Sequence, residues 1–177
     1  MRIVIATPLY PPDIADPAPY VKELAHRLVG GANVTVVTYS TIPEEVQGVK
    51  IISIPKHSFV LIRVSRFIFA LLRTSIGADM LYVQTGISSE LPASIVSSLL
   101  KIRLLIRIDS GNAEKQTRKG LLADTVRRFL IWRARAVVKS NEQLIRPEIL
   151  PLEPRPDDAL ALYDQAWAQH VTDILTA

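Results

Sequence analysis

The stretch Met1-Arg-Ile-Val-Ile-Ala-Thr-Pro-Leu-Tyr-Pro-Pro-Asp13, with the segment 19–28 after it, decides the fold. Its apolar run from Ile3 to Ala6 predicts a buried strand over residues 2–7, and the prolines that follow predict a loop. Apolar residues then recur at helical spacing, which predicts a helix over residues 18–29. A strand, a loop and a helix start form a place where backbone N–H groups can bind an anion. The G-x-G-x-x-G pattern of dinucleotide-binding proteins is absent from this unit.

The same alternation of short apolar runs and helical patterns continues along the chain. The runs are rich in Val and Ile and apolar on both sides, which is typical of parallel strands covered by helices on both faces. We therefore predict an α/β fold with a doubly wound, mostly parallel, Rossmann-like sheet, the strand 2–7 at its centre and helices 18–29 and 88–100 covering it. Further strands are predicted at 33–39, 49–54, 79–84, 103–108 and 135–139, and further helices at 59–74, 119–133 and 141–149.

The last part of the chain has a different character. Pro151, Pro154 and Pro156 interrupt regular structure, and Asp157 can cap a final helix whose apolar residues, among them Trp167, recur at spacings of three and four. The 177 residues suffice for one domain with a proper core. We predict a Rossmann-like domain over 1–150, and over 151–177 a proline-rich linker with a C-terminal amphipathic helix docked on that domain.

Several segments resemble, in order, the N-terminal, acceptor-side domain of GT-B fold glycosyltransferases of the retaining family-4 type. The resemblance covers residues 1–150 and is carried by the Tyr-Pro-Pro loop at 10–12 and by the segments 33–39, 48–55, 78–84 and 134–141. It implies an enzyme that moves a hexose from a nucleotide sugar to a lipid-linked or saccharide acceptor. The donor site of this family lies mostly in a second domain, which we expect to be absent or supplied by another chain.

The second interpretation is a non-catalytic Rossmann-like binding or membrane-associated module derived from such an enzyme. Two departures from the family pattern favour it. Ala15-Asp16 stands where family members usually have Gly-Gly, which adds a Cβ and a negative charge in front of a negatively charged donor. The loop after strand 103–108 also lacks the His that many members carry there. Asp16 can instead serve as the N-cap of the helix after it.

Candidate site residues follow from the rule that ligands of an open parallel sheet bind at the carboxyl ends of its strands. The resemblance makes Asp109 the nearest equivalent of a catalytic residue, because a carboxylate there could orient an acceptor hydroxyl. Polar strand-to-helix loops also occur for structural reasons alone, and Ser88 or Ser89 is the expected cap of the helix after Gln84. The candidate substrate-binding residues are Asp13, Asp16, Tyr20, Gln84, Gly86, Ser110, Asn112 and Glu114.

A basic pattern marks the segment 59–74. Lys56, Arg63, Arg66 and Arg73 recur at intervals of seven, three and seven in an otherwise apolar stretch, which predicts a basic amphipathic helix. One interpretation is a core helix with a solvated stripe. The other is that these four residues face an anionic membrane surface, which the resemblance supports because many family-4 enzymes use lipid-borne acceptors.

Bulk properties limit the other function classes. The net charge is +4, cysteine is absent, and the three histidines lack metal-ligand spacing, so we expect neither a metal nor a cofactor. No nucleic-acid-binding pattern is present, and no apolar run approaches the ~20 residues of a spanning helix. We expect a cytoplasmic protein, with the inner face of the membrane as its alternative place. The expected partners are a nucleotide-sugar donor, an acceptor, and a donor-domain chain or a second copy.

Overall fold

One parallel sheet organises the protein. The computed structural model describes residues 1–13, 17–57, 59–84, 86–108, 121–134, 136–139 and 157–177. Six strands lie in the order β3-β2-β1-β4-β5-β6, and β1 pairs in parallel with both β2 and β4. This confirms the predicted parallel sheet and the central place of its first strand. The strands are β1 (Arg2–Thr7), β2 (Asn33–Thr38), β3 (Val49–Ser53), β4 (Met80–Gln84), β5 (Arg103–Ile108) and β6 (Ala136–Lys139).

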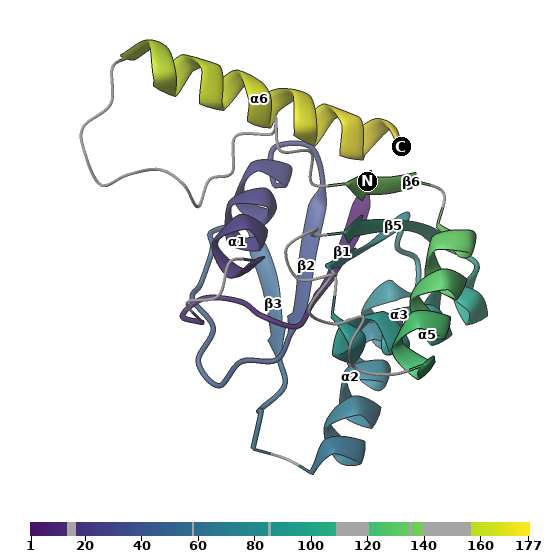
Figure 1. The fold of residues 1–177 in the computed structure, drawn as a ribbon. Helices are drawn as coiled ribbons and strands as arrows, with labels where there is room; N and C mark the ends of the chain where they lie inside the picture. Colours follow the sequence, from purple (N-terminus) through teal and green to yellow (C-terminus); the bar gives the residue numbers. More distant parts are fainter. Residues whose placement is uncertain (14–16, 58, 85, 109–120, 135, 140–156) are drawn as a thin grey trace.

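Helices cover both faces of this sheet (Figure 1), as predicted. On one face lie α1 (Pro17–Leu28) and α6 (Asp157–Thr176). On the other lie α2 (Val60–Ser75), α3 (Ile87–Leu100) and α5 (Leu121–Arg133). The helix predicted over 141–149 lies outside the described residues.

The strands supply two separate cores because successive side chains point to opposite faces. On β1, Ile3 and Ile5 join the core under α1 and α6, whereas Val4 and Ala6 join the core under α2, α3 and α5. All four side chains are almost fully buried. The unbroken apolar run of the sequence therefore reflects a strand that is buried on both sides.

A polar junction at the centre of the first core holds α6 on the sheet. The Tyr20 ring of α1 stacks on Trp167 of α6, with 5.4 Å between ring centroids. The Tyr20 hydroxyl lies 2.5 Å from Nε2 of His170 and 3.0 Å from the Tyr82 hydroxyl of β4. The guanidinium carbon of Arg107 lies over the Tyr20 ring, 3.4 Å from its centroid. One tyrosine thus links α1, α6, β4 and β5.

A second contact ties α6 to the outer side of α1. Arg27 of α1 donates to Glu23 on its own helix and to Asp164 on α6, both at 2.6 Å. Its guanidinium carbon also lies 5.4 Å from the centroid of the Trp167 ring. The ion pair with Asp164 is exposed and stabilises little, so the buried aromatic contacts carry most of the docking energy.

We therefore expect Trp167→Ala to lower the free energy of unfolding by about 3–5 kcal/mol, because a large buried ring leaves a cavity between α1 and α6. Urea denaturation followed by circular dichroism measures this. Gln165→Ala, on the exposed side of the same helix, is the matched control and should change stability by less than about 0.5 kcal/mol. Equal stability of the two variants would contradict the docking described above.

The same junction predicts a dependence of stability on pH. Burial, reinforced by the nearby Arg107 charge and partly offset by Asp173, lowers the pKa of His170 to about 4. The pKa of a histidine in the unfolded chain is about 6.5. Between pH 4 and this value the unfolded chain therefore binds more protons than the folded chain. Stability should fall as the pH drops through that window, by about 3 kcal/mol in total.

Urea denaturation at pH 7, 5.5 and 4 measures this slope. His170→Gln should remove most of it, because the amide can keep a hydrogen bond to Tyr20 without titrating. His26→Gln, at an exposed position of α1, should keep it. An identical slope in the parent and in His170→Gln would refute the assignment.

Candidate functional site

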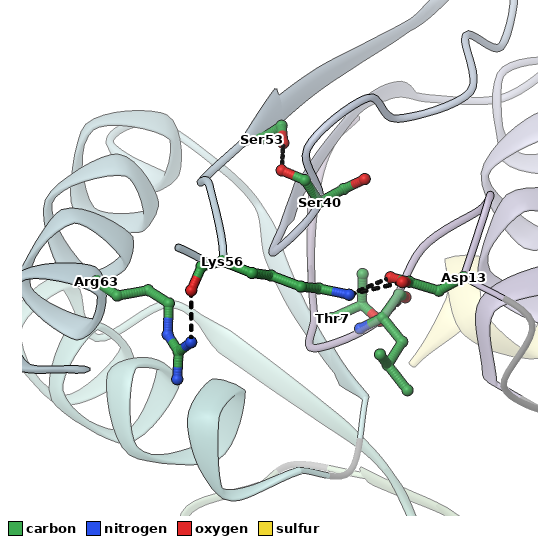
Figure 2. A network of polar contacts seen from close by, with 7 residues as sticks. Thr7, Asp13, Ser40, Ser53, Lys56 and Arg63 are labelled. Carbon is green, nitrogen blue, oxygen red and sulfur yellow. Dashed lines mark hydrogen bonds and ion pairs between the residues drawn. The ribbon is translucent and has the colours of Figure 1, made fainter. Parts of the chain in front are cut away.

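The carboxyl ends of β1 and β3 are joined by an ion pair. Lys56, in the segment after β3, donates to both carboxylate oxygens of Asp13, at 2.6 and 2.7 Å. Figure 2 shows the lysine side chain reaching across the sheet edge toward the loop that follows β1. Close by, the Thr7 hydroxyl donates to the Leu9 carbonyl at 2.7 Å, which turns the chain as it leaves β1. The two loops are thus fixed relative to each other.

Arg63 extends this network onto α2. Its Nη1 donates to the Lys56 carbonyl at 3.1 Å, and its guanidinium carbon lies 5.5 Å from the centroid of the Tyr39 ring. Burial raises the pKa of Tyr39 to about 12, with Arg63 acting in the opposite direction. The structure therefore divides the four predicted basic residues: Lys56 and Arg63 lie at the sheet edge, whereas Arg66 and Arg73 are exposed on α2.

Gln84, the last residue of β4, is the most unusual group at this edge. Its side chain is 1% exposed, and within the described part of the chain neither its amide oxygen nor its amide nitrogen has a hydrogen-bond partner. It lies on the same face as Tyr82, and Arg107 is its register neighbour on β5. The Thr38 hydroxyl, at the end of β2, is likewise buried without a partner among the described residues. Each such group costs about 1–3 kcal/mol unless something binds it.

The start of α3 differs from the expected serine cap. The N-cap residue is Gly86, without a side-chain cap, and its N–H donates to the Glu90 carboxylate one turn along the helix, at 3.2 Å. The Ser89 hydroxyl bonds the carbonyls of Gln84 and Gly86, both at 2.8 Å. A Cβ on Gly86 would lie 2.7 Å from Cγ of Pro8. Glycine is needed here because the loop after β1 packs directly against it.

Several predicted residues therefore converge and others do not. Gln84 and Gly86 lie together at the carboxyl end of β4, and Gly86 packs against Pro8 of the loop after β1. The crossovers to α1 and α3 leave this edge to opposite faces, which is where ligands bind in such sheets. Asp13, further along the loop after β1, pairs instead with Lys56 after β3. Tyr20 turns instead toward α6. The remaining predicted residues, Asp16, Asp109, Ser110, Asn112 and Glu114, lie outside the described residues.

Sequence reasoning gave His170 no role. A signal was present, because Tyr163, Trp167 and His170 recur at spacings of four and three, which places a histidine on the buried face of the last helix. In the structure all three side chains are buried.

A hollow of about 480 Å³ opens beside Asp13, between the loop after β1, helix α1 and the segment before β3. Asp13, Glu23 and Glu44 bring carboxylates to its wall, together with Lys22, and Tyr163 of α6 closes one side. Lys22 and Glu44 form an exposed ion pair across it at 2.5 Å. Carboxylate oxygens accept hydrogen bonds from hydroxyl groups and repel phosphate. In the described part of the chain, no group of three His, Asp or Glu side chains is arranged to hold a metal ion.

Comparison with known proteins shows the fold. No protein-family model and no curated protein sequence matches the chain. A structure from Listeria monocytogenes, described as a UDP-N-acetylglucosamine 2-epimerase, matches with a TM-score of 0.55 and 10% identity. UDP-GlcNAc 2-epimerase of Methanocaldococcus jannaschii matches with 0.52 and 12%. Each match covers 80% of this chain and 40% of the other, so the chain spans about two-fifths of their length. The Rossmann-like α/β fold is thereby confirmed and is consistent with a GT-B type fold.

We expect Gln84→Met to raise the free energy of unfolding by about 1–3 kcal/mol in the absence of ligand, because it removes two buried polar atoms at similar length. Thermal and urea denaturation measure this. Gln165→Met, at an exposed position of α6, is the matched control and should be neutral. A destabilised Gln84→Met protein would show that the amide is satisfied in solution.

Proposed function

We propose that this chain provides the acceptor-side domain of a GT-B type glycosyltransferase, of the family-4 kind, which moves a hexose from a nucleotide sugar to a saccharide or lipid-linked acceptor. The observation that carries the proposal is the carboxylate-lined hollow beside the carboxyl end of β1. Each of its carboxylates is held by a basic side chain, Lys56, Arg27 or Lys22, so the wall offers fixed hydrogen-bond acceptors and donors without an excess of positive charge. Such a wall suits the hydroxyl groups of an uncharged sugar better than the diphosphate of a nucleotide sugar. The chemistry of this wall is that of an acceptor site.

The fold comparison supports the same division of labour. Four-fifths of this chain superposes on about two-fifths of two structures described as UDP-GlcNAc 2-epimerases. The remainder of each of those structures is not matched by this chain. We therefore propose that the nucleotide sugar is held mainly by a region beyond this fold, on another chain or another segment.

Within this proposal each side chain has a distinct role. Asp13 accepts a hydrogen bond from an acceptor hydroxyl while Lys56 holds its carboxylate in place. The Gln84 amide both donates and accepts, so it can bind a hydroxyl at the edge between β1 and β4. Asp109 remains the proposed catalytic carboxylate, with Asp16, Ser110, Asn112 and Glu114 as proposed substrate contacts.

One observation favours the second candidate, a non-catalytic binding module. Lys56 engages both oxygens of Asp13, so the carboxylate that an acceptor would use is already paired. A chain that has lost its catalytic role could retain such a pair for stability alone. The two candidates differ in whether a saccharide competes for this carboxylate.

The experiment is a titration of the isotope-labelled chain with neutral saccharides and, separately, with UDP-sugars, followed by backbone amide chemical shifts. We expect saccharides to shift the amides around Asp13 and Glu44. Asp13→Asn should weaken binding about tenfold, since one charge-assisted hydrogen bond is worth about 1.5–3 kcal/mol. Glu45→Gln, next to Glu44 but outside the hollow, is the matched control.

The isolated chain should turn over no nucleotide sugar, because without a donor site the reacting groups are not positioned. Shifts at this hollow with UDP-sugars alone would contradict the assignment to the acceptor side. The absence of any saccharide binding would favour the non-catalytic module.

A further inference from the structure

The outer side of the layer formed by α2, α3 and α5 is apolar to an unusual degree. On α2 and at its C-cap, Ile62, Phe69 and Ile76 follow one another at intervals of seven and are 51%, 68% and 63% exposed. On α3, Leu91, Ile95 and Leu99 follow at intervals of four and are at least one-third exposed. Residues at these intervals share one face of a helix. We call these six positions, with Trp132 of α5, the outer helical face.

This face is distinct from the side of the helices that packs on the sheet. Phe67 and Leu71 fill the core beneath α2, and Ala93 and Val96 do so beneath α3. The exposed apolar residues therefore lie on the side that points away from the protein. Trp132 of α5 is 79% exposed, about twice as much as Phe129 and Ile131 of the same helix. Several large apolar side chains exposed on one helical layer favour an interaction site there.

The charges on the same layer are almost all positive. Helix α2 contains three arginines and no carboxylate, and α5 contains three arginines and Asp124. The only acidic residue of α3 is Glu90, which is 1% exposed. Exposed Arg66 and Arg73 alternate along α2 and its C-cap with Ile62, Phe69 and Ile76. On the opposite side of the sheet, α6 carries four aspartates and neither lysine nor arginine.

We propose that the outer helical face docks on an anionic lipid bilayer, with α2, α3 and α5 lying along its surface. Apolar and aromatic side chains interspersed with arginines, and nearly free of carboxylates, have the composition of helices that lie in the headgroup region. Two copies of this face would place arginines against arginines, which disfavours self-association. No helix in the described ranges is long and apolar enough to cross a bilayer. The inference is independent of the proposed sugar transfer.

The proposal revises which residues meet the membrane. Of the four basic residues predicted from the sequence, it uses Arg66 and Arg73, which are exposed on α2 between the apolar residues of the outer helical face. Lys56 and Arg63 are engaged at the sheet edge by Asp13 and Tyr39. The apolar stripe and Trp132 supply the part that inserts.

Tryptophan fluorescence gives a direct test, because the sequence contains two tryptophans, Trp132 at 79% and Trp167 at 4% exposure. The full chain is mixed with vesicles of phosphatidylcholine, with or without phosphatidylglycerol, at low and moderate salt. We expect a blue shift of the emission with anionic vesicles only, weakened by salt. Trp132→Phe should abolish the shift while leaving co-sedimentation largely intact.

Two variants separate charge from insertion. Arg66→Gln with Arg73→Gln should weaken binding to anionic vesicles about thirtyfold, as expected for two charges near the surface. Ile62→Ser with Phe69→Ser should keep the salt-sensitive attraction and reduce the blue shift. Ile42→Ser and Lys22→Gln, an exposed apolar and a basic position away from the layer, are the matched controls and should bind as the parent does.

Circular dichroism and thermal unfolding confirm that each variant is folded. The proposal fails if neutral and anionic vesicles bind equally, if Trp132 emission does not move, or if the controls lose as much binding as the variants. It also fails if light scattering shows a dimer without lipid in which Trp132 emission is already blue-shifted, since a second copy would then cover the face.

Discussion

The parallel pairing of β1 with β2 on one side and β4 on the other is the constraint on which the rest of the structure depends. It buries β1 on both faces and brings the carboxyl ends of all the strands to one edge. It also sends the chain after β1 to α1 and the chain after β4 to α3, on opposite sides of the sheet. The position between the two crossovers, where ligands bind in such sheets, is a consequence of strand order alone. Asp13 and Gln84 belong to the candidate site because they end or follow these two strands.

Much of this architecture could be predicted because a strand buried on both faces has a conspicuous sequence. The apolar run from Ile3 to Ala6 indicates such a strand without any knowledge of its neighbours in the sheet. The helices and strands of the described residues begin and end within two residues of their predicted bounds. The start of α3 shows how one such difference arises, since the helix begins at Ile87, one residue before its predicted start. Helix α3 has Gly86 at its N-cap instead of a serine, and glycine is also an accepted residue type at this position.

The arrangement of side chains was harder to predict, for reasons of helical phase. The basic residues spaced by seven, three and seven would share one face only if all four lay on one helix. Helix α2 begins at Val60, so Lys56 lies in the segment between β3 and α2. Tyr20 was assigned to the substrate site because it follows the first loop closely. One turn of α1 directs it to α6 instead. The arginine stripe indicated the exposed side of α2, but the apolar part of the outer helical face was not predicted. Apolar residues lie on both sides of α2, and their pattern alone does not reveal which of them meet the sheet.

The core under α1 and α6 contains two groups of buried polar atoms, which differ in whether they are hydrogen-bonded. Around Tyr20 the hydroxyl, imidazole and guanidinium groups contact one another, so polarity there adds specificity to the docking of α6. Gln84 lies two residues beyond Tyr82, on the same face of β4, and its amide atoms have no hydrogen-bond partner in the described part of the chain. Buried polar groups without hydrogen bonds, in a core that is otherwise apolar, are expected at sites where function opposes stability.

The contact between Tyr20 and His170 joins positions 150 residues apart. The loop that it closes encompasses nearly every strand and helix of the sheet, and closing a loop of this length is slow compared with forming local helices and hairpins. The two cores therefore differ in the order in which they can form. The core under α2, α3 and α5 uses elements that follow one another along the chain, whereas the core under α1 stays open until α6 has been synthesised. During synthesis, α1 and one face of β1 are exposed to chaperones, and to other chains, for longer than any other buried part of the protein.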